Sequence, residues 1–467
     1  MAWTIPRKDL SPEQTTIIDQ NLWLTPKSFY EGGGDSFQAF RADDNEVRLP
    51  FYFGRVLAPH RRMPRPFAAP GRTWTFGGAA QHSLRDTQIE IMTEVINQLQ
   101  TFGTSSINAS CAAGKTIMAI YAAVWANQIM AGLNLFGPVI ITYPLKLLDD
   151  QWDSTVRDFS DCYYYVVNSK KAAEAAPLAD IYLCMLESLP FLPEPIRKGC
   201  SLLILDEAHL FCTEHRLRLL MSIEPSSVLL LTATPIRANG MHSVLELLAG
   251  THAVKRIHMK PFTVWRFNTG LDPPLDKKNA QGKVDWTAVV DWLSRNPDRN
   301  NMLLEFVRLN PDRKIMIILN RVEHAEYIHK CLSDRGEWVG ILGGKHTTCK
   351  NCRVLVAIGQ KGGTGFDEKA IYSDFDGTRI DLVIIVISTK QPEQYSGRGF
   401  RALCEPHIIH FVDTGKIFDR HWKTCHDFYV QPERVGLVTV KHTNQPCGLI
   451  PTPDPPNSLI DFNISSS

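Results

Sequence analysis

Short runs of Val, Ile and Leu alternate with longer stretches of mixed polarity between about residues 100 and 235. The runs lack the polar alternation of a half-exposed strand, which is typical of strands buried on both faces of a parallel sheet. The stretches between them are long enough for helices that cover such a sheet. The pattern predicts one α/β domain whose strands are Pro138–Tyr143, Tyr163–Val167, Asp180–Met185, Ser201–Leu205 and Ser227–Leu231.

The same rhythm returns between Lys314 and Val412. It predicts a second α/β domain of similar size, so that the fold class is two parallel-sheet domains in tandem. The two halves share this alternation of strands and helices, but the sequence contains no short tandem repeat. The predicted strands of the second domain are Ile315–Leu319, Trp338–Leu342, Arg353–Ala357, Asp381–Ile387 and His407–Val412.

The flanking segments differ from both domains. The first 80 residues are rich in Pro, Gly and aromatic residues without helical period, which predicts a small N-terminal accessory module. The end of the chain contains several prolines and a Ser-rich stretch, which indicates an extended tail. We expect an accessory module at 1–80, a first α/β domain at 81–245, a connecting segment at 246–300, a second α/β domain at 301–425 and a tail at 426–467.

Composition limits the possible classes of protein. The 467 residues are 44% hydrophobic and 21% charged, without a run near the ~18 apolar residues that span a membrane. Met1–Lys8 lacks the apolar core of a secretory signal, and the scattered cysteines suit a reducing compartment. We therefore expect an intracellular protein, cytoplasmic or, if the protein is viral, also in the virion. The net charge of +1 means that any contact with nucleic acid must come from local patches.

Two local features leave alternatives open. Between Phe51 and Arg72 the chain carries arginines but no acidic residue, so this basic edge either contacts nucleic acid or a polymerase, or is a solvated loop. Cys349 and Cys352, with His346 just before them, have metal-ligand spacing. Because no second such cysteine pair exists in the chain, we favour two thiols before a buried strand over a zinc site. The arginines are Arg55, Arg61, Arg62, Arg65 and Arg72.

A loop of small residues, Ala109–Thr116, lies between a strand and a predicted helix. This order forms a phosphate cradle, because backbone N–H groups and the positive end of the helix dipole attract anions. We expect Ala113 and Gly114 to supply the loop backbone. Lys115 is then placed to reach the β- and γ-phosphates, and the Thr116 hydroxyl to ligate Mg²⁺. The motif predicts ATP and Mg²⁺ as cofactors.

Two carboxylates follow the predicted strand Ser201–Leu205. Asp206 is expected to hold Mg²⁺, and Glu207 to orient and deprotonate the attacking water. The next strand ends in Thr232-Ala-Thr-Pro. Its hydroxyls either hydrogen-bond toward His209 and couple the nucleotide state to the second domain, or only stabilise a turn.

Three polar residues of the second domain share one helical spacing. Gln394, Arg398 and Arg401 fall at i, i+4 and i+7, which predicts that they line one face of a helix. We expect the two guanidinium groups to act as arginine fingers, worth roughly 10³ to 10⁵ in rate in other NTPases. The alternative is a solvated basic face. Upstream of the loop, the Gln88 amide can both donate to and accept from an adenine edge, which favours ATP.

These motifs, in this order, resemble those of the superfamily 2 helicases and translocases. Among them, the chain is similar to the DEAH-type helicases of large cytoplasmic DNA viruses, related to the poxvirus transcript-release helicase. The resemblance covers about residues 84–413. It implies two RecA-like domains, with ATP between them and single-stranded nucleic acid lying across both.

The resemblance also assigns roles by position. Pro144–Trp152 is similar to the segment that touches the nucleic-acid backbone. Gly365 and Asp367 resemble the fifth motif, which links nucleic acid to ATP, and Gln394 belongs to the sixth motif. One departure is Ile358, which stands where the family usually has a threonine that contacts the strand.

We therefore expect an ATP-dependent helicase that couples ATP hydrolysis to movement along, and unwinding of, nucleic acid. Single-stranded DNA is favoured over RNA because Thr-Ala-Thr-Pro and the Gly-Phe-Asp form of the fifth motif resemble DNA-acting members. The alternatives are a translocase or transcription-release factor that works with a polymerase without separating strands, an RNA helicase, and a catalytically silent scaffold. The retention of Lys115, Glu207 and Arg398 argues against the scaffold.

Overall fold

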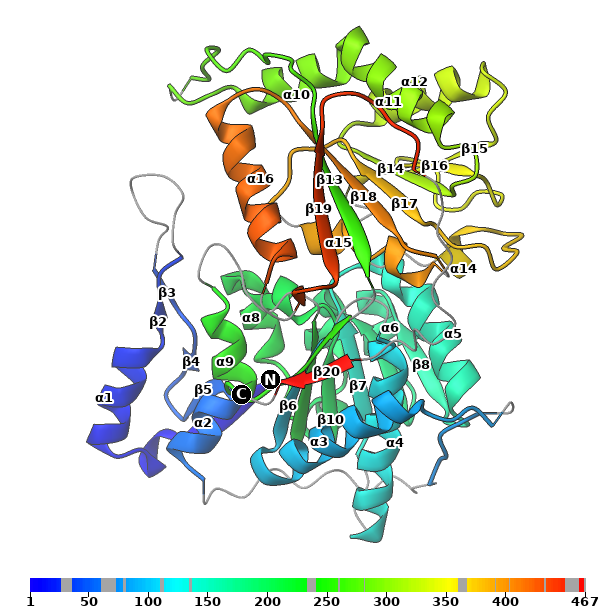
Figure 1. Cartoon of the computed structure of the whole chain (residues 1–467). Helices are drawn as coiled ribbons and strands as arrows, with labels where there is room; N and C mark the ends of the chain where they lie inside the picture. The colour runs from blue at the N-terminus through cyan, green and yellow to red at the C-terminus, as the bar shows by residue number, and fades with distance from the viewer. Residues whose placement is uncertain are drawn as a thin grey trace. The chain divides into compact units, whose positions relative to one another are not determined.

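The chain forms two compact α/β units, Met1–Arg256 with Ile464–Ser467, and Ile257–Asn463 (Figure 1). Each unit is built on one large, mainly parallel sheet, which confirms the predicted fold class, with a small sheet module at the N-terminus. The computed structural model describes residues 1–26, 36–59, 73–78, 81–109, 113–133, 137–232, 241–258, 261–280, 282–359, 368–390, 392–402, 404–431, 434–449 and 462–465. Across these ranges, no helix is both long and apolar enough to cross a membrane.

The N-terminal module has a three-stranded antiparallel sheet in the order β1-β5-β4, a separate two-stranded sheet of β2 and β3, and two helices. The helix α1 begins with a capping box, in which Ser11 and Gln14 satisfy each other's backbone N–H groups. Trp3 packs edge-on against Phe51 at 5.7 Å between ring centroids, within the same core cluster as Leu203 of the first parallel sheet. The module therefore shares its core with that sheet. Its elements are β1 (Ala2–Pro6), α1 (Pro12–Asn21), β2 (Trp23–Leu24), β3 (Phe37–Gln38), β4 (Arg41–Ala42), β5 (Glu46–Pro50) and α2 (Phe51–Leu57).

The first large sheet has the strand order β20-β12-β6-β11-β10-β7-β9-β8. The strand before the phosphate loop, β6, is thus separated from β10, the strand before the paired carboxylates, by β11 alone. Its strands are β6 (Thr104–Ala109), β7 (Val139–Tyr143), β8 (Tyr164–Val167), β9 (Ile181–Met185), β10 (Leu202–Leu205), β11 (Ser227–Thr232), β12 (Val254–His258) and β20 (Phe462–Ser465). The helices of this unit include α3 (Asp86–Phe102), α4 (Lys115–Gly132), α5 (Asp149–Phe159), α6 (Lys170–Glu174), α7 (Glu194–Lys198), α8 (Glu214–Leu220) and α9 (Ser243–Ala249).

The second sheet pairs its strands in parallel in the order β15-β16-β14-β17-β18-β13-β19. Two of them, β13 and β19, come from segments that the hydrophobic pattern did not assign to a sheet. The strands are β13 (Phe262–Asn268), β14 (Ile315–Leu319), β15 (Val339–Leu342), β16 (Val354–Ile358), β17 (Leu382–Ile385), β18 (His407–Val412) and β19 (Val438–Thr443). All ten predicted strands are present in the two sheets, with bounds within two residues of those expected.

Helices cover both faces of the second sheet. Buried residues of α10 and α16 form one core cluster with the sheet, and buried residues of α11 and α12 form another. A buried ion pair joins α11 to the end of β18, where Arg299 donates to both Asp413 oxygens at 2.9 and 3.0 Å. The helices are α10 (Trp286–Arg295), α11 (Pro297–Leu309), α12 (Val322–Ser333), α14 (Glu368–Ile371), α15 (Pro392–Ser396) and α16 (Lys416–Tyr429).

The chain after β19 is held against the second unit by its main chain. Asn310 donates to the Cys447 carbonyl at 3.0 Å and accepts the Leu449 N–H at 2.6 Å. Arg313, whose side chain is fully buried, donates to the Leu449 carbonyl at 2.9 Å. Part of the predicted tail is therefore an ordered part of this unit.

Candidate active site

The phosphate-loop motif lies between the end of β6 and the start of α4. Gly114 caps α4 with φ 78° and ψ 37°, a left-handed conformation that glycine adopts without a steric penalty. The Lys115 ammonium donates to the Ala109 carbonyl at 2.7 Å, so this side chain reaches back across the loop toward β6. Residues 110–112 lie outside the described part of the chain. The described ends of the loop thus have the strand, turn and helix that a phosphate cradle requires.

Gln88 on α3 contacts the same loop. Its amide nitrogen donates to the Ala113 carbonyl at 3.1 Å, and its oxygen accepts the Arg85 N–H at 3.1 Å. Only 3% of the residue is exposed, and a Cβ at Gly114 would lie 2.5 Å from the Gln88 nitrogen. The tight packing means that Gln88 supports the loop, while its role in reading adenine stays a prediction.

The paired carboxylates lie directly after β10. Asp206 is 6% exposed, and one of its oxygens accepts the Glu207 N–H at 2.9 Å. Burial, followed by the nearby Glu207 carboxylate, raises the pKa of Asp206 to about 7, whereas Lys115 acts in the opposite direction. Glu207 itself has φ 52° and ψ 48°, which is rare for a residue with a side chain. This turn carries the chain from the strand into a short 3-10 helix, Ala208–Phe211.

His209 joins the carboxylates to the neighbouring strand β11. Its Nδ1 lies 3.1 Å from the Thr232 hydroxyl and 3.5 Å from a Glu207 carboxylate oxygen. The predicted hydrogen bond between His209 and the Thr232 motif is therefore confirmed. Residues 233–235, which complete that motif, lie outside the described residues.

Two consecutive residues of α5 contact the proposed Mg²⁺ ligands. Gln151 donates to the Thr116 hydroxyl at 3.2 Å, and the Trp152 indole N–H donates to an Asp206 oxygen at 2.9 Å. Both residues belong to the segment that resembles a nucleic-acid contact, and their contacts with Thr116 and Asp206 do not follow from that resemblance. One feature of the sequence could have indicated that Trp152 faces the sheet. Trp152 and Val156 stand at i and i+4, and these two are the buried residues of α5.

The residues present fit a divalent cation. Thr116, Asp206 and Glu207 offer hydroxyl and carboxylate oxygens, which are the ligands that Mg²⁺ prefers. Burial and then the neighbouring Glu207 carboxylate raise the pKa of Asp206, and a nearby cation would favour the charged form of Asp206. We therefore retain Thr116 and Asp206 as the residues that would hold Mg²⁺.

The sixth-motif segment of the second unit differs from the expected helix. α15 ends at Ser396, and Arg401 lies in a separate 3-10 helix, Gly399–Arg401. The prediction of one continuous helical face is therefore wrong, because Gly397 and Gly399 flank Arg398 and glycine costs roughly 1 kcal/mol in a helix interior.

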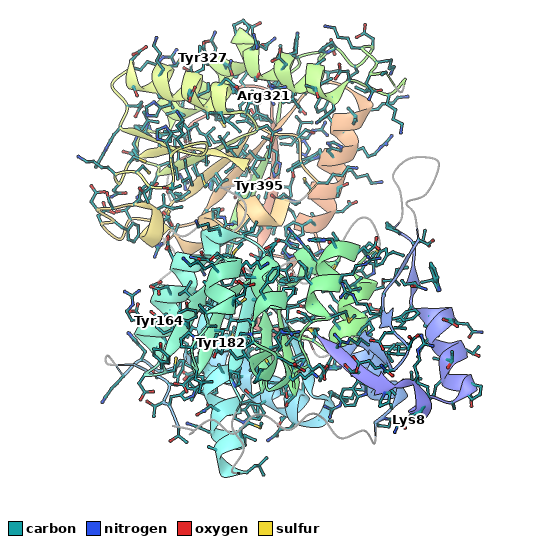
Figure 2. The ribbon with its side chains drawn as sticks, turned by 180° about the vertical axis from the view of Figure 1, so that it is seen from behind. Lys8, Tyr164, Tyr182, Arg321, Tyr327 and Tyr395 are labelled. Atoms are coloured by element: carbon teal, nitrogen blue, oxygen red, sulfur yellow. The ribbon has the colours of Figure 1, made fainter. Side chains whose placement is uncertain are left out.

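The structure describes only part of this predicted group. Arg398 is 5% exposed, whereas the side chains of Gln394 and Arg401 lie outside the described set. Tyr395 lies in α15 (Figure 2), and its carbonyl accepts the Arg398 N–H at 3.2 Å. A Cβ at Gly359 would be 3.3 Å from the Tyr395 hydroxyl. The sixth-motif segment thus packs against the end of β16. Gly365 and Asp367, in residues 360–367, also lie outside the described part.

The cysteine pair lies beside β15 and β16, with Cys352 buried and Cys349 partly exposed. A Cβ at Gly340 would meet the sulfurs of Cys352 and Cys349 at 2.9 and 3.2 Å. A hydrogen bond from the Cys349 thiol lowers the pKa of Cys352. Within the ranges that the structure describes, no three or more His, Cys, Asp or Glu side chains are grouped to hold a metal ion.

The basic edge of the N-terminal module is described only at Arg55. A Cβ at Gly103 would overlap the Arg55 guanidinium, so this side chain packs over the start of β6. Burial lowers the pKa of Arg55. Arg61, Arg62, Arg65 and Arg72 lie outside the described residues, and the role of this edge stays a prediction.

The chain is similar to one protein-family profile and to helicases of large DNA viruses. A family profile described as "Type III restriction enzyme, res subunit" matches residues 81–237. "Putative helicase 055L" of Frog virus 3 is 29% identical over 343 residues, covering 72% of this chain and 75% of the relative. "Putative helicase 109L" of Invertebrate iridescent virus 3 is 30% identical over 269 residues, covering 55% of this chain and 78% of the relative.

Among solved structures, yeast Dbp5 bound to RNA and ADP BeF3 is similar, with 13% identity and a TM-score of 0.49 over 76% of this chain and 89% of that one. The viral relatives, the matched profile and the strand order around the phosphate loop point to the same family. The chain belongs to the superfamily 2 helicases, enzymes that act on nucleic acid, and resembles those encoded by large DNA viruses.

Proposed function

We propose that this protein is an ATP-dependent helicase that moves along single-stranded DNA and separates strands as it hydrolyses ATP. The observation that supports this most strongly is the convergence of the phosphate loop, the paired carboxylates and the Thr232 hydroxyl around β6, β10 and β11. Parallel strands of one sheet bring these groups together although they are far apart in the sequence.

Each group then has a chemical role. The backbone around Ala113 and Gly114 and the Lys115 ammonium would bind the phosphates, and Gln88 would support the loop from α3. Mg²⁺, held by Thr116 and Asp206, would neutralise developing phosphate charge. Glu207 would orient the attacking water and accept its proton.

Residues of the second unit complete the proposal. Arg398 and Arg401 would stabilise negative charge on the transferred phosphate, as arginine fingers do in other NTPases. Gln394, Gly365 and Asp367 would link nucleotide and nucleic-acid binding. His209 is already hydrogen-bonded to Thr232 and lies 3.5 Å from Glu207, so it can pass a change at the carboxylates on to β11.

ATP turnover measured without polynucleotide, with single-stranded DNA and with RNA tests the function. We expect DNA to stimulate turnover most, and Lys115→Ala to reduce it by roughly 10² to 10³ while DNA binding persists. Glu207→Gln should keep ATP bound without hydrolysis. Lys198→Ala, on the exposed face of α7, is the matched control and should leave turnover unchanged.

The same experiment separates the rivals. Stimulation by RNA but not DNA would replace the DNA assignment, and unchanged turnover in Lys115→Ala would refute the catalytic one. A fluorescent duplex assay run beside a triplex-displacement assay distinguishes strand separation from translocation alone. Triplex displacement without duplex opening would support the translocase or transcription-release alternative.

A further inference from the structure

The helix α5 holds both proposed Mg²⁺ ligands through two adjacent side chains. Gln151 reaches Thr116 at the start of α4, and Trp152 reaches Asp206 at the end of β10. Thr116 and Asp206 are 90 residues apart in the sequence and belong to different elements. One helix therefore fixes two groups that must act on the same cation.

The contact from Trp152 is especially well defined. The Trp152 side chain is fully buried, and Asp206 is 6% exposed, so water cannot easily replace the indole donor. An indole has one N–H and no acceptor, so it can meet a carboxylate in only one way. Because the other Asp206 oxygen accepts the Glu207 N–H, both oxygens are oriented by donors within the protein.

The helix α5 is itself held by contacts on two sides. Tyr164 on β8 (Figure 2) donates its hydroxyl to Asp153 at 2.9 Å, and on the sheet-facing side Val156 is fully buried one turn after Trp152. Donors that orient metal ligands typically change metal affinity by 10- to 100-fold when they are removed. A donor held this firmly has the properties of a positioning residue.

We propose that Gln151 and Trp152 are positioning residues for the Mg²⁺–nucleotide site, an inference that rests on the proposed function. Gln151 orients the Thr116 hydroxyl, and Trp152 orients the Asp206 carboxylate. Neither side chain contacts the nucleotide in this role. They determine how tightly the site holds Mg²⁺ and therefore how well it binds the Mg²⁺-bound nucleotide.

The position of α5 adds a link to nucleic acid. α5 begins at Asp149, directly after the 3-10 helix Lys146–Leu148 in the segment for which backbone contact is proposed. A displacement of that segment would be transmitted within one helical turn to Gln151 and Trp152. Binding of a single strand should thus change the affinity for Mg²⁺, and by linkage Mg²⁺ should change the affinity for the strand.

The test is a binding measurement that does not depend on turnover. A fluorescent, non-hydrolysable ATP analogue is titrated with Mg²⁺ in wild type, Trp152→Phe and Gln151→Leu, and thermal unfolding checks that each variant is folded. We expect the half-saturating Mg²⁺ concentration to rise about 10- to 100-fold in Trp152→Phe. Gln151→Leu, which removes the amide on a partly exposed side chain and is the milder change, should also raise it.

One control variant and two contrary outcomes complete the test. Trp338→Phe changes an indole that is 61% exposed in the other unit and should leave the titration unchanged. A shift below twofold in both folded variants would overturn the positioning role. Failure of wild type to bind the analogue in a Mg²⁺-dependent way would instead refute the proposed function.

The link to nucleic acid has its own measurement. A single-stranded oligonucleotide should alter the half-saturating Mg²⁺ concentration of wild type, and this response should be lost in Trp152→Phe. An equal response in both proteins would show that the coupling does not pass through Trp152.

Discussion

The backbone of Glu207 has a conformation that its own side chain disfavours. Its φ of 52° and ψ of 48° place it in the left-handed region, where Gln81 is the other non-glycine residue with positive φ in the described part of the chain. This conformation costs a residue with a Cβ roughly 1 to 2 kcal/mol. Strain of this kind persists where function requires a particular side chain. We therefore predict that Glu207→Gly yields a more stable but inactive protein.

A comparison of two variants isolates the strain. Glu207→Gln removes the charge beside Asp206 but keeps the Cβ, whereas Glu207→Gly removes both. The relief of roughly 1 to 2 kcal/mol is partly offset by the extra freedom of glycine in the unfolded chain, about 0.5 to 1 kcal/mol. With the middle of each range, the net gain of Glu207→Gly over Glu207→Gln is about 0.75 kcal/mol. For a unit of this size, that corresponds to a Tm increase of about 1 to 4 °C.

Thermal unfolding of the two variants is the assay, with ATP turnover measured on the same samples. Glu90→Gly, at an exposed position inside α3, is the matched control and should lose about 1 kcal/mol because glycine disfavours a helix interior. Both Glu207 variants should lack turnover. If Glu207→Gly unfolds at or below the temperature of Glu207→Gln, the strain reasoning is wrong.

Two further predictions concern the second unit. Burial lowers the pKa of His324 and His410 to about 3, so both stay neutral in the folded state. In the unfolded chain they take up protons below about pH 6.5, so the free energy of unfolding decreases as the pH falls from 6.5 toward 3. At pH 5 this decrease in unfolding free energy is about 2 kcal/mol for each histidine. In His410→Gln, Tm should therefore decline less between pH 7 and pH 5 than in wild type. An unchanged slope of Tm against pH would contradict the prediction. Arg299→Met leaves the Asp413 carboxylate buried without its guanidinium partner and should lower the free energy of unfolding by about 3 to 5 kcal/mol. The double variant Arg299→Met with Asp413→Leu should recover most of this loss. Equal Tm values for the single and double variants would refute the pairing argument.

The hydrophobic pattern was sufficient for strands that are buried on both faces. Ile315–Leu319 and His407–Val412 were predicted with the bounds that the structure has, because continuous apolar runs have few other stable environments. The strand β19 was missed because its exposure alternates and it contains Lys441 and His442, as expected of an edge strand. The pattern was therefore informative where burial was complete and uninformative at the edge of the sheet.

The motifs predicted which groups meet, but not what supports them. The contact between His209 and Thr232 followed from two adjacent strand ends, a property of parallel sheets that spacing alone reveals. The contacts of Gln151 and Trp152 depend on how α5 packs beside α4 and against β8 and β9, which no local pattern encodes. The sixth motif was expected on one helix because its side-chain spacing was counted without the two glycines that end α15.

The position of β13 has a consequence for how the protein is made. β13 is the first strand of the second sheet to be synthesised, and one of its two neighbours, β19, is the last, with Thr263 pairing with Thr439. Both edges of β13 therefore stay unpaired until β18 has been made, and one edge stays unpaired until β19 has been made. Such edges recruit other strands, so a chain halted before Val438 would be prone to aggregate.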